Sequence, residues 1–132
     1  MTPGELHRLG EILVAGMAEL GAVKWPSDTR SFALAVDDTK ATNKLAARFY
    51  VVHGSTGRYC HDYRNVQAML HQATLISYDT IDHGRFNVRI SPRSAVAIYR
   101  RIQATAQEKA DARALLLAHW ERAYGKPLEV PQ

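Results

Sequence analysis

A helical repeat runs directly into two alternating segments between residues 66 and 90. Apolar side chains recur at steps of three and four residues, which predicts an amphipathic helix over residues 63–73. These apolar positions are Val66, Met69, Leu70 and Ala73. Leu75 to Thr80 and Arg85 to Ile90 then alternate as half-buried strands do, so we expect a hairpin. Gly84 closes the intervening turn, where a positive φ is expected.

The second of these strands has one apolar and one polar face. Alternate residues of a strand point to opposite sides, so Phe86, Val88 and Ile90 share one face. Arg85, Asn87 and Arg89 share the other. We therefore expect one side to be buried and the other to offer cations and an amide to a partner.

Upstream, leucine and methionine recur helically over residues 4–20, and Gly21 is placed to cap that helix. Residues 31–36 have the composition of a short strand. Residues 39–53 are predicted to be helical, although residues 48–53 are rich in strand formers, so strand remains an alternative there. Asp62 is expected to cap the helix that follows.

The C-terminal part of the chain has a helical rhythm. Ser91 is a suitable N-cap, and Pro92 suits the first helical position, where no N–H is needed. The rhythm continues to about Tyr124, and Gly125 and Pro127 should stop it. An unbroken helix would be roughly 50 Å long at about 1.5 Å per residue. Its distal half should pack on the N-terminal helix or reach another subunit.

The predicted order of helix, strand, helix, helix, hairpin and helix resembles that of winged helix-turn-helix DNA-binding proteins. The resemblance covers residues 31–101. It differs from the family at the long, strand-like segment 48–53 and at the extended connection over residues 54–61. It implies an α+β, mainly helical fold with an N-terminal helix, a two-stranded wing and a long C-terminal helix. It also implies that the outward side chains of residues 63–73 read a major groove. These are Arg64, Gln67, His71 and Gln72, with small Ala68 permitting close approach.

On the same interpretation, Arg85 and Arg89 on the wing grip an adjacent backbone or minor groove. Lys44 and Arg58 could each neutralise a phosphate. Each of these cations could instead decorate a solvated surface.

Composition sets the remaining limits. A chain of 132 residues, 46% hydrophobic and 23% charged, fits a single domain over residues 1–132. The net charge of +4 favours an acidic partner. The single cysteine excludes an intrachain disulfide and favours the cytoplasm. The apolar stretch at residues 12–18 is too short to span a bilayer and follows Glu5 and Glu11, so we expect no membrane or export signal.

No catalytic, metal or cofactor motif is evident. Cys60 and the histidines His53, His61 and His71 lack a recognised ligand spacing, so no metal is expected. Turn and cap roles account for Asp37, Asp38, Asp79 and Asp82. Residues 54–57 lack the lysine and the strand-to-helix context of a phosphate loop.

The leading functional hypothesis is a DNA-binding protein of a phage, plasmid or bacterium that acts in transcription or replicon control. We expect double-stranded DNA as the partner and a homodimer built from the terminal helices. One alternative is a protein-interaction module, an inhibitor or adaptor whose basic surface occupies a host protein's nucleic-acid site. Another is a small α+β enzyme, which a cleft holding Cys60, His61 or Asp79 would favour.

Overall fold

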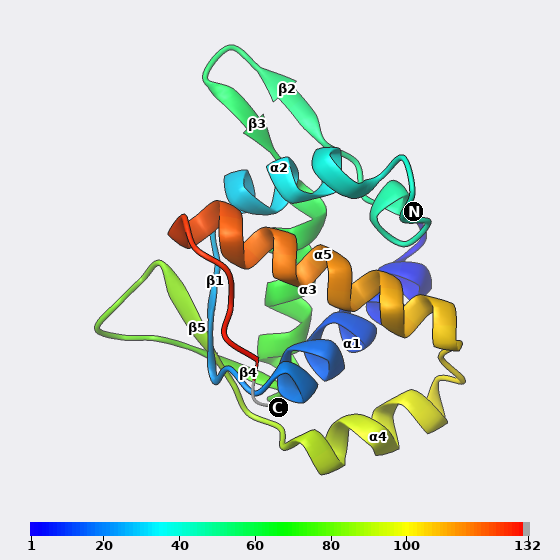
Figure 1. Cartoon of the computed structure of the whole chain (residues 1–132). Helices are drawn as coiled ribbons and strands as arrows, with labels where there is room; N and C mark the ends of the chain where they lie inside the picture. Colours follow the sequence, from blue (N-terminus) through cyan, green and yellow to red (C-terminus); the bar gives the residue numbers. More distant parts are fainter. Residues whose placement is uncertain (131–132) are drawn as a thin grey trace.

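The computed structural model describes residues 1–130, which form five α-helices and two small antiparallel sheets (Figure 1). The helices are α1 (Pro3–Leu20), α2 (Thr29–Thr39), α3 (His61–Gln72), α4 (Pro92–Arg101) and α5 (Ala106–Tyr124), with one 3-10 turn, η1 (Ala46–Arg48). The strands are β1 (Lys24–Pro26), β2 (Val52–Gly54), β3 (Gly57–Tyr59), β4 (Ile76–Tyr78) and β5 (Arg85–Val88). The fold is therefore α+β and mainly helical, as predicted.

Helix α1 is the centre of the packing. Thr2 caps its start by accepting the Glu5 N–H, and Gly21 ends it in the left-handed conformation at φ 84°. Every residue from Leu9 to Ala18 is buried, because α3, α4 and α5 pack around the helix. The apolar stripe of α1 is thus covered by the chain itself.

The strand expected at residues 31–36 is wrong, because these residues lie in α2. Asp28 accepts the Ser31 N–H at 2.8 Å and so caps the helix start. Phe32 and Val36 then share the buried face of α2, which packs against α5. Strand β1 precedes α2 instead and pairs with β5, with Trp25 opposite Phe86.

The long helix expected over residues 39–53 is also wrong. A buried side chain, Asn43, organises the segment: its Oδ1 accepts the Ala46 N–H, and its Nδ2 donates to the Asp111 carbonyl at 2.8 Å. Only the short η1 turn forms there. Residues 52–54 are strand β2, which pairs with β3 in a two-stranded sheet. The strand alternative for residues 48–53 is therefore right for its last two residues.

The hairpin predicted over residues 75–90 is confirmed, with shorter strands. β4 pairs with β5 so that Ile76 lies opposite Val88, and the strand order of the sheet is β1-β5-β4. Phe86 and Val88 are buried, as the alternation predicted. The expected positive φ at Gly84 is not found. Carboxylates shape this turn instead, since Asp79 and Asp82 accept backbone N–H groups within it.

The single long C-terminal helix is wrong, since the chain breaks after α4. Gln103 takes a positive φ of 55°, and Thr105 then starts α5 through a capping box with Glu108. Ser91 and Pro92 begin α4 as predicted, and Gly125 ends α5 at φ 71°. After the break α5 returns across α1 and α2, which confirms that the distal half packs on the N-terminal helix.

Aromatic rings join the helices in the core. The rings of Phe32 on α2 and Tyr63 on α3 are stacked, with centroids 4.0 Å apart. Phe49 and His119 meet the Phe32 ring edge-on, at 5.1 and 5.3 Å. The orientation of α3 is therefore fixed by α2, α5 and the segment before β2.

Candidate nucleic-acid interface

Helix α3 begins earlier than predicted, at His61. Cys60 occupies the N-cap position and makes no side-chain cap hydrogen bond. Asp62, the expected cap, lies inside the first turn, where a carboxylate interacts favourably with the helix dipole. Its Oδ2 accepts the Tyr50 N–H at 3.0 Å. The capping prediction for Asp62 is therefore wrong, and the residue instead ties the preceding segment to α3.

Close contact with α1 sets the depth of α3 in the fold. Gly10 on α1 faces Val66 and Met69, and a Cβ placed on Gly10 would lie 3.2 Å from Val66 Cγ1 and 2.6 Å from Met69 Cε. A larger residue at Gly10 would therefore require both the Met69 methyl group and Val66 to shift. The buried side chains of α3 are Tyr63, Val66, Gln67 and Leu70.

The opposite face of α3 is exposed. Its members are His61, Arg64, Asn65, Ala68, His71, Gln72 and Ala73. Of the residues expected to read a groove, Arg64, His71 and Gln72 lie on this outer face. Ala73 was expected to be inward and is exposed, so that prediction is wrong. Below, "outer face of α3" means this set.

Gln67 is not on the outer face, which corrects its assignment as a base-reading residue. It is only 5% exposed, and its Nε2 donates to the Ser27 carbonyl at 2.9 Å. The buried arc extends to Gln67 because Tyr63, four residues earlier, belongs to the core. Counting Tyr63 as apolar in the helical repeat would have revealed this.

A hollow of about 430 Å³ lies between the start of α2, α3 and β4. It is lined by Ser27, Asp28, Thr29, Arg30, Arg64, Gln67 and Tyr78. Neither Arg30 nor Arg64 forms an ion pair within residues 1–130. Arg30 was missed because residues 31–36 were assigned to a strand. Recognising Asp28 as a helix cap would have placed Arg30 in an exposed first turn.

Histidine and tyrosine rings continue this surface toward β4. The ring of His71 on the outer face of α3 lies 4.8 Å from the ring of Tyr78, and both residues are exposed. Flat side chains of this kind can pack against sugars or bases. Tyr78 also lines the hollow with Arg64, so α3 and β4 share one surface.

The β4–β5 loop is less cationic than expected. Arg85 Nε donates to Asp82 Oδ2 at 2.8 Å, so an acidic neighbour offsets its charge. Asp79 Oδ1 accepts the N–H groups of Ile81 and Asp82, and its other oxygen pairs with Lys24. That lysine contact, with the amide hydrogen bonds, holds the pKa of Asp79 well below its usual value. Arg89 follows β5 at the open end of the hairpin, away from this loop, and is exposed.

The remaining predicted cations lie in two different places. Lys44 lines a separate hollow with Arg48, Thr105 and Glu108 at the start of α5. The structure therefore does not bring Lys44 to the hollow that Arg64 lines. Arg58 on β3 donates through Nη1 to Asp37 Oδ2 at 3.1 Å.

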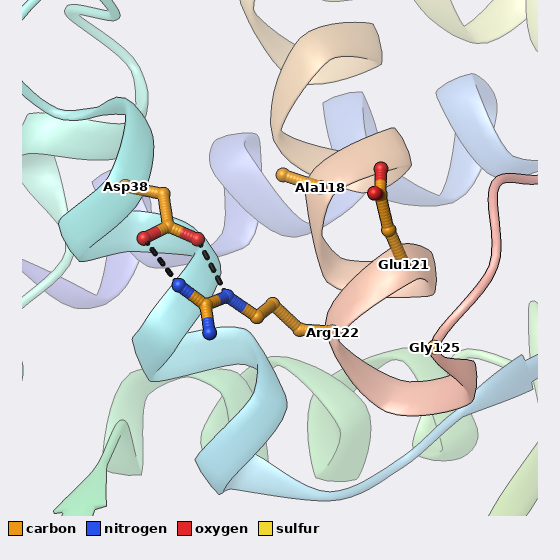
Figure 2. A pocket seen from close by; sticks show the side chains of 5 residues that line it. All are labelled: Asp38, Ala118, Glu121, Arg122 and Gly125. Atoms are coloured by element: carbon orange, nitrogen blue, oxygen red, sulfur yellow. Dashed lines mark hydrogen bonds and ion pairs between the residues drawn. The ribbon is translucent and has the colours of Figure 1, made fainter.

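Another hollow, of about 440 Å³, lies between α2 and the end of α5 (Figure 2). Arg122 crosses it toward Asp38 and donates twice to the carboxylate, at 2.7 and 2.8 Å. Figure 2 shows Glu121 pointing away from this pair. The pair lowers the pKa of Asp38 and joins two helices. This geometry fits a structural ion pair that holds α2 and α5 together.

The residues considered for an enzymatic or metal site are dispersed. Cys60 is buried, and burial raises the pKa of its thiol to about 11, so it stays protonated at neutral pH. His61 is exposed on α3, and Asp79 is held by Lys24. Among the described residues, no group of three or more His, Cys, Asp or Glu side chains could hold a metal ion. No helix within residues 1–130 has the length and hydropathy needed to cross a membrane.

Comparisons with known proteins add no family. No protein-family model, curated protein or solved structure matches this chain significantly.

Proposed function

We propose that this protein binds duplex DNA and inserts the outer face of α3 into the major groove. It would act as a winged helix-turn-helix protein, either in the regulation of transcription or in the replicon control of a phage or plasmid. The order of elements supports the proposal. Helix α1, strand β1, helices α2 and α3, and the β4–β5 hairpin follow one another in the predicted order of element types. Strand β1 and helix α2 occupy other residues than predicted, and β2–β3 is inserted between α2 and α3.

The outer face of α3 is the observation that carries the proposal. An α-helix with its side chains is about 10–12 Å wide, and the major groove of B-DNA is about 12 Å wide. The outer face offers Arg64 and Gln72, side-chain types that bind guanine and adenine in bidentate fashion. Ala68 lies between them and leaves room for a base edge.

Unpaired charge beside α3 supports the same proposal. Arg30 and Arg64 line one hollow and form no ion pair among residues 1–130, and guanidinium groups of this kind attract phosphates. Arg89 adds an exposed cation near the sheet. Arg85 contributes less than its position suggests, because Asp82 is bonded to it.

The test is Arg64→Ala, measured by fluorescence anisotropy on a mixed pool of duplex DNA at several salt concentrations. Arg113→Ala is the matched control, since Arg113 is also exposed but lies on α5 beside Tyr99 and Lys109. We expect Arg64→Ala to weaken binding by about 1–3 kcal/mol and Arg113→Ala to leave it unchanged. Wild-type binding that is absent, or insensitive to salt, would contradict the proposal.

The homodimer expected from the sequence stays a prediction. Because α1 is covered within its own chain, a dimer would use the exposed sides of α4 or α5 instead. Val96 on α4 is an exposed apolar residue suited to such a contact. Sedimentation equilibrium of the wild type and of Val96→Glu would test it, the variant shifting a dimer toward monomer.

A further inference from the structure

The β2–β3 hairpin is an arm inserted between α2 and α3. Figure 1 shows it at the edge of the molecule, extending beyond α2 with its tip in solvent. Ser55 and Thr56 form a two-residue turn, and Gly57 takes a φ of 130° that other residues rarely adopt. His53 lies opposite Arg58, so both side chains share one face of the arm. The hairpin is therefore a short, tightly turned element that carries basic side chains.

The permanent cations around this arm, Arg58 on β3 and Lys40 at the end of α2, outnumber the one carboxylate that they share. Asp37 on α2 accepts from Arg58 at 3.1 Å and pairs with Lys40 at 3.0 Å, while His53 lies 4.0 Å away. One carboxylate is thus shared by two permanent cations, which leaves a positive excess. Arg58 uses only Nη1 in this pair, and its other N–H groups have no hydrogen-bond partner among residues 1–130, so they can bind an anion.

The arm lies next to the outer face of α3 at both ends of β3. A Cβ placed on Gly57 would lie 3.9 Å from Arg30 Nε, so the Arg30 side chain reaches the hairpin tip. Arg30 in turn lines the same hollow as Arg64. At the other end of β3, the Tyr59 ring lies 4.8 Å from that of His61, the first residue of α3.

The two hairpins differ in their suitability for a polyanion. Residues 76–88, which form the β4–β5 hairpin, contain two aspartates, Asp79 and Asp82, and one arginine, Arg85. Residues 52–59 contain Arg58 and His53 and no acidic residue. Ile81, at the tip of the β4–β5 loop, is 93% exposed and apolar. A phosphate backbone would therefore approach the β2–β3 arm more favourably than the β4–β5 loop.

We propose that the β2–β3 hairpin is a second DNA-binding arm, which contacts the phosphate backbone of the duplex beyond the N-terminal end of α3. The inference rests on the proposed function, because it extends the surface formed by the outer face of α3. Arg58 supplies the direct phosphate contact. Arg30 contacts the backbone between the arm and the groove that Arg64 enters.

Two arginines of this chain form a matched pair for the test. Arg58 and Arg122 have side chains 48% and 46% exposed, and they pair with the adjacent α2 residues Asp37 and Asp38. Replacing either one by alanine removes one positive charge and one ion pair with α2. Only Arg58 lies on the proposed arm, whereas Arg122 lies on α5.

The affinity of Arg58→Ala, Arg122→Ala and Arg58→Lys for duplex DNA is measured against salt concentration, after thermal unfolding has verified that each variant folds. We expect Arg58→Ala to reduce the slope of log K against log salt by about 0.9, the value for one lost phosphate contact. Arg122→Ala should retain the wild-type slope, and Arg58→Lys should recover most of it.

Equal salt slopes for Arg58→Ala and wild type would overturn the proposal that the hairpin is a DNA-binding arm. An equal reduction of the slope in Arg58→Ala and Arg122→Ala would overturn it as well. Arg64→Ala separates this failure from that of the proposed function. If Arg64→Ala weakens binding and Arg58→Ala does not, the α3 interface stands without the arm. If the wild type binds no duplex at all, both proposals fail.

Discussion

Tyr63 and His119 share one acceptor, the carbonyl oxygen of Pro26. Tyr63 Oη donates to it at 2.8 Å, and His119 Nε2 lies 2.9 Å from the same oxygen. Because a carbonyl can only accept, His119 carries its proton on Nε2. The two donors come from α3 and α5 and meet at the end of β1. This buried junction therefore positions α3 relative to the C-terminal helix and the sheet.

Removal of one donor should measure how much this junction stabilises the fold. Tyr63→Phe keeps the ring that stacks on Phe32 and deletes only the hydroxyl. The Pro26 carbonyl keeps its bond to His119, so no polar group becomes orphaned. We expect a loss of about 1 kcal/mol in the free energy of unfolding, measured by urea denaturation with an unchanged m-value. Unchanged stability would show that the hydroxyl contributes nothing.

The buried imidazole should make stability depend on pH. Burial lowers the pKa of His119 below its usual 6.5, so the folded protein resists protonation that the unfolded chain accepts. Its contribution is fully present above pH 6.5 and is lost as pH falls from 6.5 toward the lower pKa of the folded state. His119→Gln can still donate to Pro26 but does not titrate.

Urea unfolding of wild type and His119→Gln between pH 7.5 and 5 checks this expectation. The variant should be less stable than wild type at pH 7.5, because glutamine fits the aromatic site less well. Its stability should then fall less steeply with acid, so that the two curves converge. Parallel curves would mean that His119 is not the group responsible.

The success of the sequence predictions depended on how local the determining contacts are. The β4–β5 hairpin was predictable because alternation directly reflects which side chains are buried, as Phe86 and Val88 are. The start of α4 was predictable because Ser91 caps it within three residues. In both cases, neighbours in the sequence determine the structure.

Distant contacts explain what was missed. Residues 31–36 fit a strand or a helix by composition, and α5, some 80 residues later, buries Phe32 against His119 and selects the helix. The segment after α2 is held by Asn43 bonded to Asp111, a contact that no local pattern reveals. For the site, Arg64, His71 and Gln72 were found because exposure follows helical period. Arg30 was lost with the misassigned helix.

Close packing of α3 on α1 gives a further prediction. Gly10→Leu would place a side chain where Met69 and Val66 already lie, so α3 must move away from α1. We expect a destabilisation of about 1–3 kcal/mol, as overpacked cores show, together with weaker DNA binding. Gly4→Leu is the control, since nothing lies within 4 Å of a Cβ at Gly4 in the same helix. Thermal unfolding of the two variants should differ clearly, and equal behaviour would contradict the close approach.

The structure and the sequence alone assign different roles to Gln67, and a substitution can distinguish the two roles. If Gln67 read a base, Gln67→Ala would weaken DNA binding and leave the fold intact. Since its Nε2 instead donates to the Ser27 carbonyl, the variant leaves a partly buried acceptor without this partner. We therefore expect a loss of about 1–3 kcal/mol in unfolding free energy. The salt dependence of DNA binding should stay the same at temperatures where the variant is folded.

Gln72→Ala, on the exposed outer face, should behave in the opposite way: wild-type stability with weaker DNA binding. If Gln67→Ala kept wild-type stability but lost affinity for DNA, Gln67 would be a base-reading residue, which would contradict its buried position.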